Sequence, residues 1–173
     1  MKGTILKCLQ EMVESRFGKQ EWKQILSESG FAPTQLFTLS ADVDEQKTLA
    51  LFSNTAEVLE IPAEQVMDDF GDYWVNEYAS RIYHTLFGRL KSAREFILGM
   101  DQVHIMVTST IENAQPPRFE FEERGPKVLV VTYKSKRGLI DLYIGLARGV
   151  GKYFGTPLEI VKLNQRQVQI TFP

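Results

Sequence analysis

The spacing of the hydrophobic residues changes once along this chain, and that change constrains the fold more than any other feature. Up to Ile111, apolar residues recur every three or four positions, which is the spacing of amphipathic helices. Pro116 and Pro117 then prevent a helix from continuing. Beyond them apolar and charged residues alternate, as in Phe119-Glu-Phe121, which is typical of strands. We therefore predict an α+β fold, with helices first and a sheet later.

The helical pattern divides into segments that end at glycines or before prolines. We expect helices over about residues 5–17, 22–30, 44–60, 66–78 with a broken continuation to 90, and 92–111. The last of these begins with Ser92-Ala-Arg-Glu95, a capping box. The remainder predicts two hairpins around one helix, with strands 119–122 and 128–133, a helix 139–154, and strands 158–163 and 168–172. The hairpins predict an antiparallel sheet.

Composition excludes several classes of protein. The chain has 173 residues, 20 Lys+Arg and 22 Asp+Glu, so its net charge of −2 gives no electrostatic reason to expect a nucleic acid or an anionic membrane as partner. It contains no apolar stretch near the roughly 20 residues of a membrane helix. The single cysteine, Cys8, cannot form an internal disulfide. The first residues lack the apolar core of a signal peptide, so we expect a cytoplasmic protein.

His104 is the residue with the clearest potential for chemistry. The chain has two histidines, His84 and His104, so a metal site must use one of these or carboxylates. His104 shares an apolar helix face with Met100 and Val107, and an imidazole there needs hydrogen bonds or a metal. A hydrogen-bonded core histidine is the more common case, and only Asp101, which also suits solvent, lies one turn away. A lone imidazole suits heme, because the macrocycle supplies the other four ligands.

Two further patterns have a structural and a functional interpretation. Tyr133, Ser135 and Arg137 alternate, so in a strand they share one face as three donors, which suits an anion as well as a solvated strand end. Gly145 and Gly149 lie four apart in a predicted helix, where glycine lowers helix stability by about 1 kcal/mol. Close packing on the sheet explains them as well as a flat ligand does. The phosphate-loop, serine-hydrolase and zinc-protease motifs are absent.

Four motifs in this order resemble the heme nitric oxide/oxygen binding (H-NOX) family, the bacterial relatives of the heme domain of soluble guanylate cyclase. They are Met-Lys-Gly-Thr-Ile5, Met100-Asp-Gln-Val-His104, Pro116-Pro117-Arg118 and Tyr133-x-Ser135-x-Arg137. The resemblance covers essentially the whole chain and fits a stand-alone bacterial member. It implies a single domain of residues 1–173, in which a helical lobe, 1–62, and an α+β lobe with a four-stranded antiparallel sheet, 63–173, hold the heme between them.

The resemblance also implies a role for each matching residue. His104 would be the proximal ligand of the iron in heme b (protoporphyrin IX iron). Tyr133, Ser135 and Arg137 would hydrogen-bond the heme propionates, while Ile5 and Pro117 would press on the macrocycle and distort it. The full set of residues expected to hold or line the cofactor is Tyr133, Ser135, Arg137, Ile5, Leu9, Trp74, Met100, Pro117 and Leu142.

The distal residues bear on which gas is sensed. Dioxygen-binding members carry a distal tyrosine on the helix after the Tyr-x-Ser-x-Arg motif, and that position aligns with Leu142 here. Leu9 and Trp74 stand at the two positions that support the tyrosine. The chain departs from the dioxygen pattern at all three, so we predict a nitric oxide sensor that also binds carbon monoxide. A shift of one residue would instead place Tyr143 in the pocket, which keeps a dioxygen sensor as the alternative.

The family mechanism predicts a switch rather than an enzyme. Nitric oxide weakens the bond trans to itself, so His104 leaves the iron and its helix shifts. The signal would pass to a partner, either a histidine kinase or a cyclic-di-GMP enzyme. A rival interpretation is an apolar-ligand or adaptor module without heme, in which His104 is simply buried. A heme peroxidase is disfavoured, because the sequence offers no identifiable distal His/Arg pair.

Overall fold

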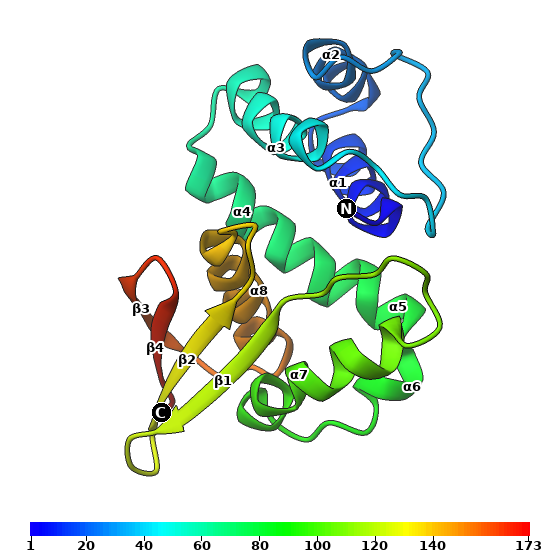
Figure 1. Cartoon of the computed structure of the whole chain (residues 1–173). Helices are drawn as coiled ribbons and strands as arrows, with labels where there is room; N and C mark the ends of the chain where they lie inside the picture. Colours follow the sequence, from blue (N-terminus) through cyan, green and yellow to red (C-terminus); the bar gives the residue numbers. More distant parts are fainter. The chain divides into compact units, whose positions relative to one another are not determined.

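The computed structural model describes all 173 residues, and the chain separates into two compact units, Met1–Phe70 and Gly71–Pro173. The order of helices and strands along the chain can be followed in Figure 1. The sequence predicted a division after residue 62. In the structure it falls eight residues later, inside helix α4 (Ala63–Tyr73).

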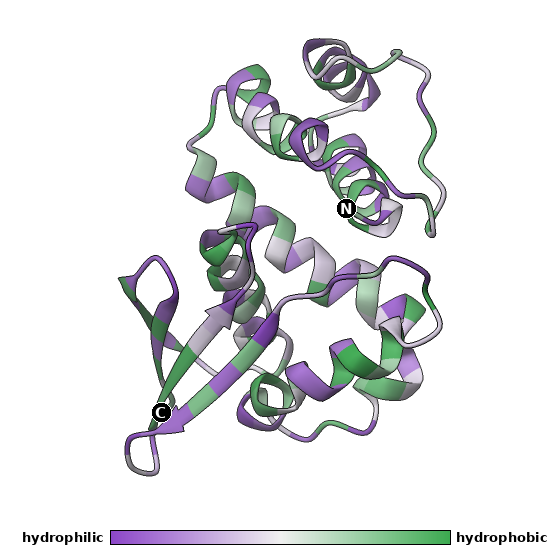
Figure 2. Cartoon of the chain, in the orientation of Figure 1, coloured by the Kyte–Doolittle hydropathy of each residue, from purple (hydrophilic) through white to green (hydrophobic).

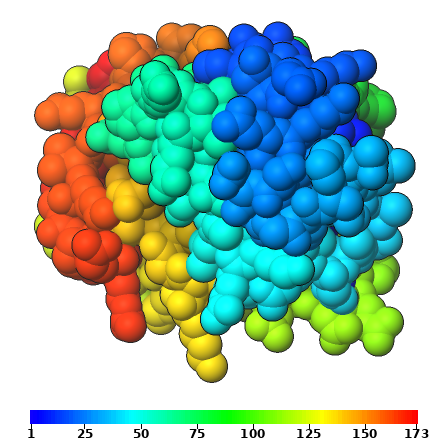
Figure 3. Space-filling model, turned by 90° about the horizontal axis from the view of Figure 1, so that it is seen from above, coloured from blue at the N-terminus to red at the C-terminus, as the bar shows by residue number.

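The first unit is built from helices α1 (Gly3–Arg16), α2 (Lys19–Glu28) and α3 (Glu45–Leu59). Their side chains, coloured blue to cyan in Figure 3, pack closely together. The apolar residues predicted to face inward, among them Leu9, Trp22 and Ile25, are almost fully buried. Asp44 begins α3 by accepting a hydrogen bond from the backbone N–H of Lys47 at 2.9 Å.

Helix α4 does not end at a break but changes its hydrogen-bond pattern. It continues as a π-helix, η1 (Trp74–Ala79), and then as the short helices α5 (Ser80–Ile82) and α6 (His84–Phe87). The sequence predicted a helix to Tyr78 and a broken stretch beyond it, without the π-helix. π-Helical turns are rare and occur frequently at functional sites. Trp74, one of the predicted site residues, is the first residue of this turn.

Helix α7 (Ala93–Thr108) begins where the capping box predicted. The hydroxyl of Ser92 accepts from the Glu95 N–H at 3.1 Å, and the Glu95 carboxylate accepts from the Lys91 N–H at 2.8 Å. The glutamate thus reaches one residue beyond the serine, so the cap binds two free backbone donors in a slightly different way. The helix ends three residues earlier than predicted, and Ile111 lies in the turn that follows.

The predicted sheet is confirmed. Strands β1 (Arg118–Glu123), β2 (Val128–Lys134), β4 (Gln167–Thr171) and β3 (Glu159–Asn164) lie side by side in that order, and every pair is antiparallel. Helix α8 (Ile140–Tyr153) connects β2 to β3. Figure 2 shows the alternation of hydrophobic and hydrophilic residues along β1 that the sequence pattern predicted. No helix is both long and apolar enough to span a membrane.

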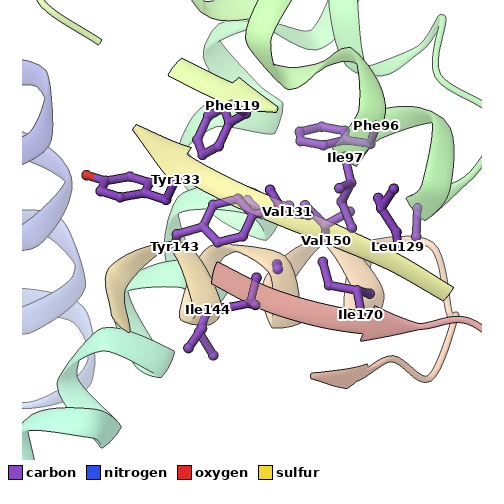
Figure 4. Close-up of a cluster of buried hydrophobic side chains, with 14 of the residues drawn as sticks. Phe96, Ile97, Phe119, Leu129, Val131, Tyr133, Tyr143, Ile144, Val150 and Ile170 are labelled. Carbon is purple, nitrogen blue, oxygen red and sulfur yellow. The ribbon is translucent and has the colours of Figure 1, made fainter. Parts of the chain in front are cut away.

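One face of this sheet carries the core of the second unit. Leu129, Val131, Val168 and Ile170 point to this face and are fully buried. Ile144, Ala147 and Val150 of α8 pack on them, and so do Phe96 and Ile97 of α7 (Figure 4). Helix α7, which carries Met100 and His104, and helix α8, which carries Leu142, are therefore fixed to the same sheet face.

Candidate functional site

The His104 imidazole is half-buried on α7, and its hydrogen bond fixes which nitrogen carries the proton. Nδ1 lies 3.3 Å from the carbonyl oxygen of Pro117. Since a carbonyl oxygen can only accept, Nδ1 carries the proton and Nε2 of the neutral ring has a lone pair. Burial lowers the pKa of the imidazole below its usual value, which favours this neutral form. A histidine oriented by a backbone carbonyl, with its other nitrogen available, is the usual form of a metal ligand.

Asp101, one turn before His104, binds the same segment of chain. Its carboxylate accepts from Arg118 Nε at 2.8 Å, from Arg118 Nη2 at 2.6 Å and from the backbone N–H of Phe119 at 2.9 Å. These hydrogen bonds, the one to Arg118 foremost, lower the pKa of the Asp101 carboxyl from 3.8 to about 2. The sequence suggested a solvated helix residue or a neighbour of His104. The only sequence signal for the Asp101–Arg118 contact was the presence of an arginine directly after Pro117. The spacing of the two residues did not connect them.

One aromatic ring, that of Phe119, contacts His104 and links it to two tyrosines on the sheet side. The Phe119 ring lies 5.6 Å from the His104 ring and 5.0 Å from the Tyr143 ring, and the Tyr143 and Tyr133 rings are 6.4 Å apart. In Figure 4 the rings of Phe119, Tyr133 and Tyr143 lie around β2, and the Tyr133 hydroxyl points away from the other two rings. The Tyr143 hydroxyl is buried without a hydrogen-bond partner, and burial raises the pKa of this phenol. An unpartnered buried hydroxyl costs about 1–3 kcal/mol.

The Tyr133-x-Ser135-x-Arg137 motif is not a continuous strand. Strand β2 ends at Lys134, and residues 135–138 form a turn, in which the Ser135 hydroxyl accepts from the Arg137 N–H at 3.2 Å. Arg137 Nη1 donates to the carbonyl of Gln115. The expected alternation of the three side chains on one strand face is therefore wrong, because the turn rotates the chain after Tyr133. The three donors still lie within five consecutive residues, at the end of β2 and in the turn that follows it.

Helix α8 presents two different faces. Tyr143 and Ile144 belong to the cluster on the sheet. Leu142 is 8% exposed and lies outside that cluster, on the helix face it shares with Gly145 and Gly149. The two residues that the sequence left as alternatives for one position thus point in different directions, and only Tyr143 faces the sheet.

The glycines of α8 contact a helix rather than the sheet. A Cβ atom on Gly71 of α4 would lie 2.1 Å from the backbone carbon of Gly145, and one on Gly149 would lie 2.5 Å from the Gly71 oxygen. Asn76 of the π-helix donates from Nδ2 to the Gly149 carbonyl at 3.2 Å. Close packing was the expected reason for Gly145 and Gly149, but the sheet was the wrong partner, because α8 turns these residues away from it. The helix that carries Trp74 and the helix that carries Leu142 therefore meet backbone to backbone.

The other predicted site residues are distributed over both units. Ile5 is half-buried and Leu9 fully buried on α1 of the first unit. In the second unit, Met100 is half-buried on α7 and Pro117 is half-buried directly before β1. The second unit brings His104 together with Pro117, and Phe119 links it through ring contacts to Tyr133.

The donor set at His104 limits which metal group fits. No three His, Cys, Asp or Glu side chains lie close enough together to hold a metal ion. A metal at His104 must therefore bring its other ligands with it, as the iron of heme does. The neutral imidazole, its orientation by the Pro117 carbonyl and the adjacent Phe119 ring fit such a group.

Comparison with known proteins agrees with this chemistry. The sequence profile of the family described as Haem-NO-binding matches residues 2–162. Soluble guanylate cyclase gcy-35 of Caenorhabditis elegans is 22% identical over 171 residues, which cover 96% of this chain and 25% of the relative. Soluble guanylate cyclase gcy-32 of the same organism is 24% identical over 157 residues, covering 88% of this chain and 23% of the relative. The chain thus spans about a quarter of the length of these relatives.

Solved structures share the fold over nearly the whole chain. An H-NOX protein variant from S. oneidensis in the Fe(II) state has a TM-score of 0.89 and 19% identity, covering 100% of this chain and 96% of that one. An oxygen-binding H-NOX domain related to soluble guanylate cyclases, in its oxygen complex, has a TM-score of 0.82 and 23% identity, covering 99% and 95%. Because the family profile matches almost the entire sequence, the chain belongs to the Haem-NO-binding, or H-NOX, family of heme-binding gas sensors.

Proposed function

We propose that this chain senses nitric oxide through ferrous heme b bound by His104. The observation that carries the proposal is the hydrogen bond from His104 Nδ1 to the Pro117 carbonyl, which leaves Nε2 as the nitrogen for the iron. When bound, heme would supply the iron to which the gas binds, and its four ring nitrogens would be the other ligands of that iron. Tyr133, Ser135 and Arg137 would hold the propionates through their hydroxyl and guanidinium donors.

His104 would act as the moving part. On binding of nitric oxide, His104 would be released from the iron, and the turn of α7 around it would shift. The ring would keep its hydrogen bond to the Pro117 carbonyl, so the released imidazole would stay oriented. Ile5 and Pro117 would press on the macrocycle, as the family resemblance implies.

The choice of nitric oxide over dioxygen rests on Leu142. Bound dioxygen is strongly polarised and gains from a nearby O–H donor, whereas nitric oxide binds without one. An aliphatic side chain at the aligned distal position provides no such donor. The Tyr143 ring packs in the cluster on the sheet, 5.0 Å from the Phe119 ring, which supports the assignment of Leu142 rather than Tyr143 to the distal position. Carbon monoxide, which is also indifferent to a donor, would bind as well.

A spectroscopic experiment tests this proposal. Purified ferrous protein should show a Soret band, should shift on addition of nitric oxide to the spectrum of a complex without a histidine ligand, and should form no stable oxygenated spectrum in air. His104→Gly should lose the histidine-ligated spectrum and regain it with imidazole. His84→Gly, which removes the other histidine, should behave as wild type. A stable oxygenated spectrum would favour the dioxygen sensor, and the absence of a Soret band would favour the adaptor module without heme.

The output would be conformational and would reach a partner protein, with a histidine kinase or a cyclic-di-GMP enzyme as the proposed classes. The chain would have no catalytic activity of its own. The partner's activity should respond to nitric oxide with the wild-type chain. It should not follow nitric oxide in the same way with His104→Gly rescued by imidazole, because free imidazole can leave the iron without moving α7. Identical responses would contradict this mechanism.

A further inference from the structure

One turn of α7 is joined by four polar contacts to residues 117–119, at the start of β1. Asp101 accepts three of them, two from the Arg118 side chain at 2.8 and 2.6 Å and one from the Phe119 N–H at 2.9 Å. His104, at the other end of the same turn, contributes the fourth through Nδ1 and the Pro117 carbonyl. Three consecutive residues, 117–119, are therefore bound by two side chains that project from one helical turn.

These contacts differ in strength and in accessibility. The Asp101 side chain is 14% exposed and its pair with Arg118 is bidentate, an arrangement that fixes direction as well as distance. The Phe119 ring lies 5.6 Å from the His104 ring at an interplanar angle of 33°, so it supports the imidazole from the side. The single hydrogen bond at 3.3 Å from Nδ1 is the weakest of the set. The Asp101 contacts hold Arg118 and Phe119, the two residues that follow Pro117, and so hold the segment that orients the imidazole.

We propose that Asp101 and Arg118 are positioning residues for His104, and that they fasten its helical turn to residues 117–119 so that a movement of His104 is passed into the sheet. This inference rests on the proposed function in that His104 is the iron ligand. It adds the route by which the movement leaves the site. Asp101 and Arg118 do not touch the reacting atoms and act only through His104 and its hydrogen-bond partner.

The packing of α7 favours the sheet as the receiving element. Beyond His104 the helix is poorly packed, with Ile105 40% and Met106 57% exposed, and it ends at Thr108. In contrast, Phe119 is paired with Tyr133 across β1 and β2, and β2 pairs in turn with β4. A displacement of residues 117–119 therefore meets a continuous hydrogen-bonded sheet, whereas a displacement of the end of α7 meets few neighbours.

The histidine ring N–H provides a direct test of positioning. In the diamagnetic Fe(II)–CO protein with isotope-labelled histidine, His104 and His84 are the only two histidine signals, so His84 serves as an internal reference. The His104 Nδ1–H should exchange slowly with water in the wild type and about tenfold faster or more in Asp101→Asn and Arg118→Gln. Glu122→Gln, which breaks the exposed Glu122–Arg124 pair of the same hairpin, is the matched control and should leave this rate unchanged. Equal exchange rates in wild type, Asp101→Asn and Arg118→Gln would overturn the proposal.

Amide exchange tests the route of the movement. In wild type and Glu122→Gln, nitric oxide should change exchange in residues 118–123 and 128–134. In Asp101→Asn and Arg118→Gln this change should be lost, although the absorption spectrum still reports release of His104. A change that persists in both variants would contradict the route. Arg118→Lys keeps the positive charge but loses the bidentate geometry of the guanidinium, so it should retain part of the change in amide exchange. This partial retention would show that the loss in the other variants is not caused by misfolding. The absorption spectrum of the wild type tests the proposed function separately. If nitric oxide does not release the histidine there, the proposed function itself fails.

Discussion

Two regions of the second unit hold their helices in opposite ways. At His104, α7 is joined to β1 by side-chain hydrogen bonds, foremost those of Asp101 with Arg118. Where α8 crosses α4, Gly145 and Gly149 meet Gly71 backbone to backbone. The first contact joins a helix and a strand through side chains, which can follow a small shift of either element. The second leaves no room for a side chain.

This difference suggests that the two contacts have different roles in a conformational switch. A conformational switch needs one element that moves and a frame that stays in place, because the signal is the displacement of the first relative to the second. The polar contact around His104 suits the moving element, because side-chain hydrogen bonds can hold a helical turn to a strand while both shift together. The glycine crossing suits the frame, because closely packed backbones cannot slide without separating. The crossing also fixes the helix of Trp74 against the helix of Leu142.

The largest effect is expected from filling the glycine crossing. In Gly71→Ala the new Cβ would lie 2.1 Å from the backbone of Gly145, and no side-chain rotation relieves that contact. We expect a loss of about 3 kcal/mol or more in the free energy of unfolding, measured by urea denaturation. Gly99→Ala in the middle of α7 is the control, because a Cβ there meets nothing within 4 Å. It should gain about 0.5–1 kcal/mol. A Gly71→Ala protein as stable as wild type would show that the crossing is not a rigid frame.

The glycines also illustrate what the sequence could and could not predict. Helix-interior glycines at 145 and 149 signal a close approach, because nothing else offsets their low helix propensity. The identity of the approaching element depends on Gly71, far away in the sequence, and no local pattern connects it to α8. The helices and hairpins were predicted well for the opposite reason, since hydrophobic period and capping are properties of neighbouring residues.

The site shows the same limit. The pattern identified His104 and Tyr133 because each stands in a regular element whose face can be read from spacing. It failed at Ser135 and Arg137, because β2 ends at Lys134 and the turn that follows obeys local hydrogen bonds rather than alternation. The role of Asp101 depends on a tertiary contact with Arg118, and the neutral tautomer of His104 depends on a carbonyl 13 residues away.

The next largest effect is expected at Leu142, on the face of α8 that the glycines fix in place. Leu142→Tyr would introduce an O–H donor at the aligned distal position. A hydrogen bond to a strongly polarised ligand contributes about 1.5–3 kcal/mol, so dioxygen affinity should rise roughly 10- to 100-fold, measured by absorption titration of the ferrous protein. Leu142→Phe has a similar bulk without the hydroxyl and should produce no such gain. An equal gain with phenylalanine would mean that size, and not the donor, controls dioxygen binding.

A smaller effect is expected where the polar contact is opened. Asp101→Asn should lower the free energy of unfolding by about 1–2 kcal/mol near neutral pH, a value reduced for the exposure of Arg118. The pKa of Asp101 is lowered in the folded protein from 3.8 to about 2, so the stabilisation is present above about pH 4 and is lost as the pH falls through 2. The difference between wild type and Asp101→Asn should therefore shrink over this acid range. Glu122→Gln, at an exposed pair, should differ little from wild type. A pH-independent difference would mean that the asparagine disturbs packing rather than charge.

The smallest effect, and one of opposite sign, is expected at Tyr143, which stands between the two regions on the sheet face of α8. Its buried hydroxyl has no hydrogen-bond partner in the chain, so Tyr143→Phe should raise the free energy of unfolding of the heme-free protein by about 0.5–1.5 kcal/mol. Tyr153→Phe on the same helix is the control, because its ring is 39% exposed and its hydroxyl can bind water. Removing that hydroxyl should leave the urea midpoint unchanged. If Tyr143→Phe lowered the free energy of unfolding instead, the hydroxyl would have a hydrogen-bond partner. Helix α8 would then be tied to the residues around His104, and the two regions could not move independently.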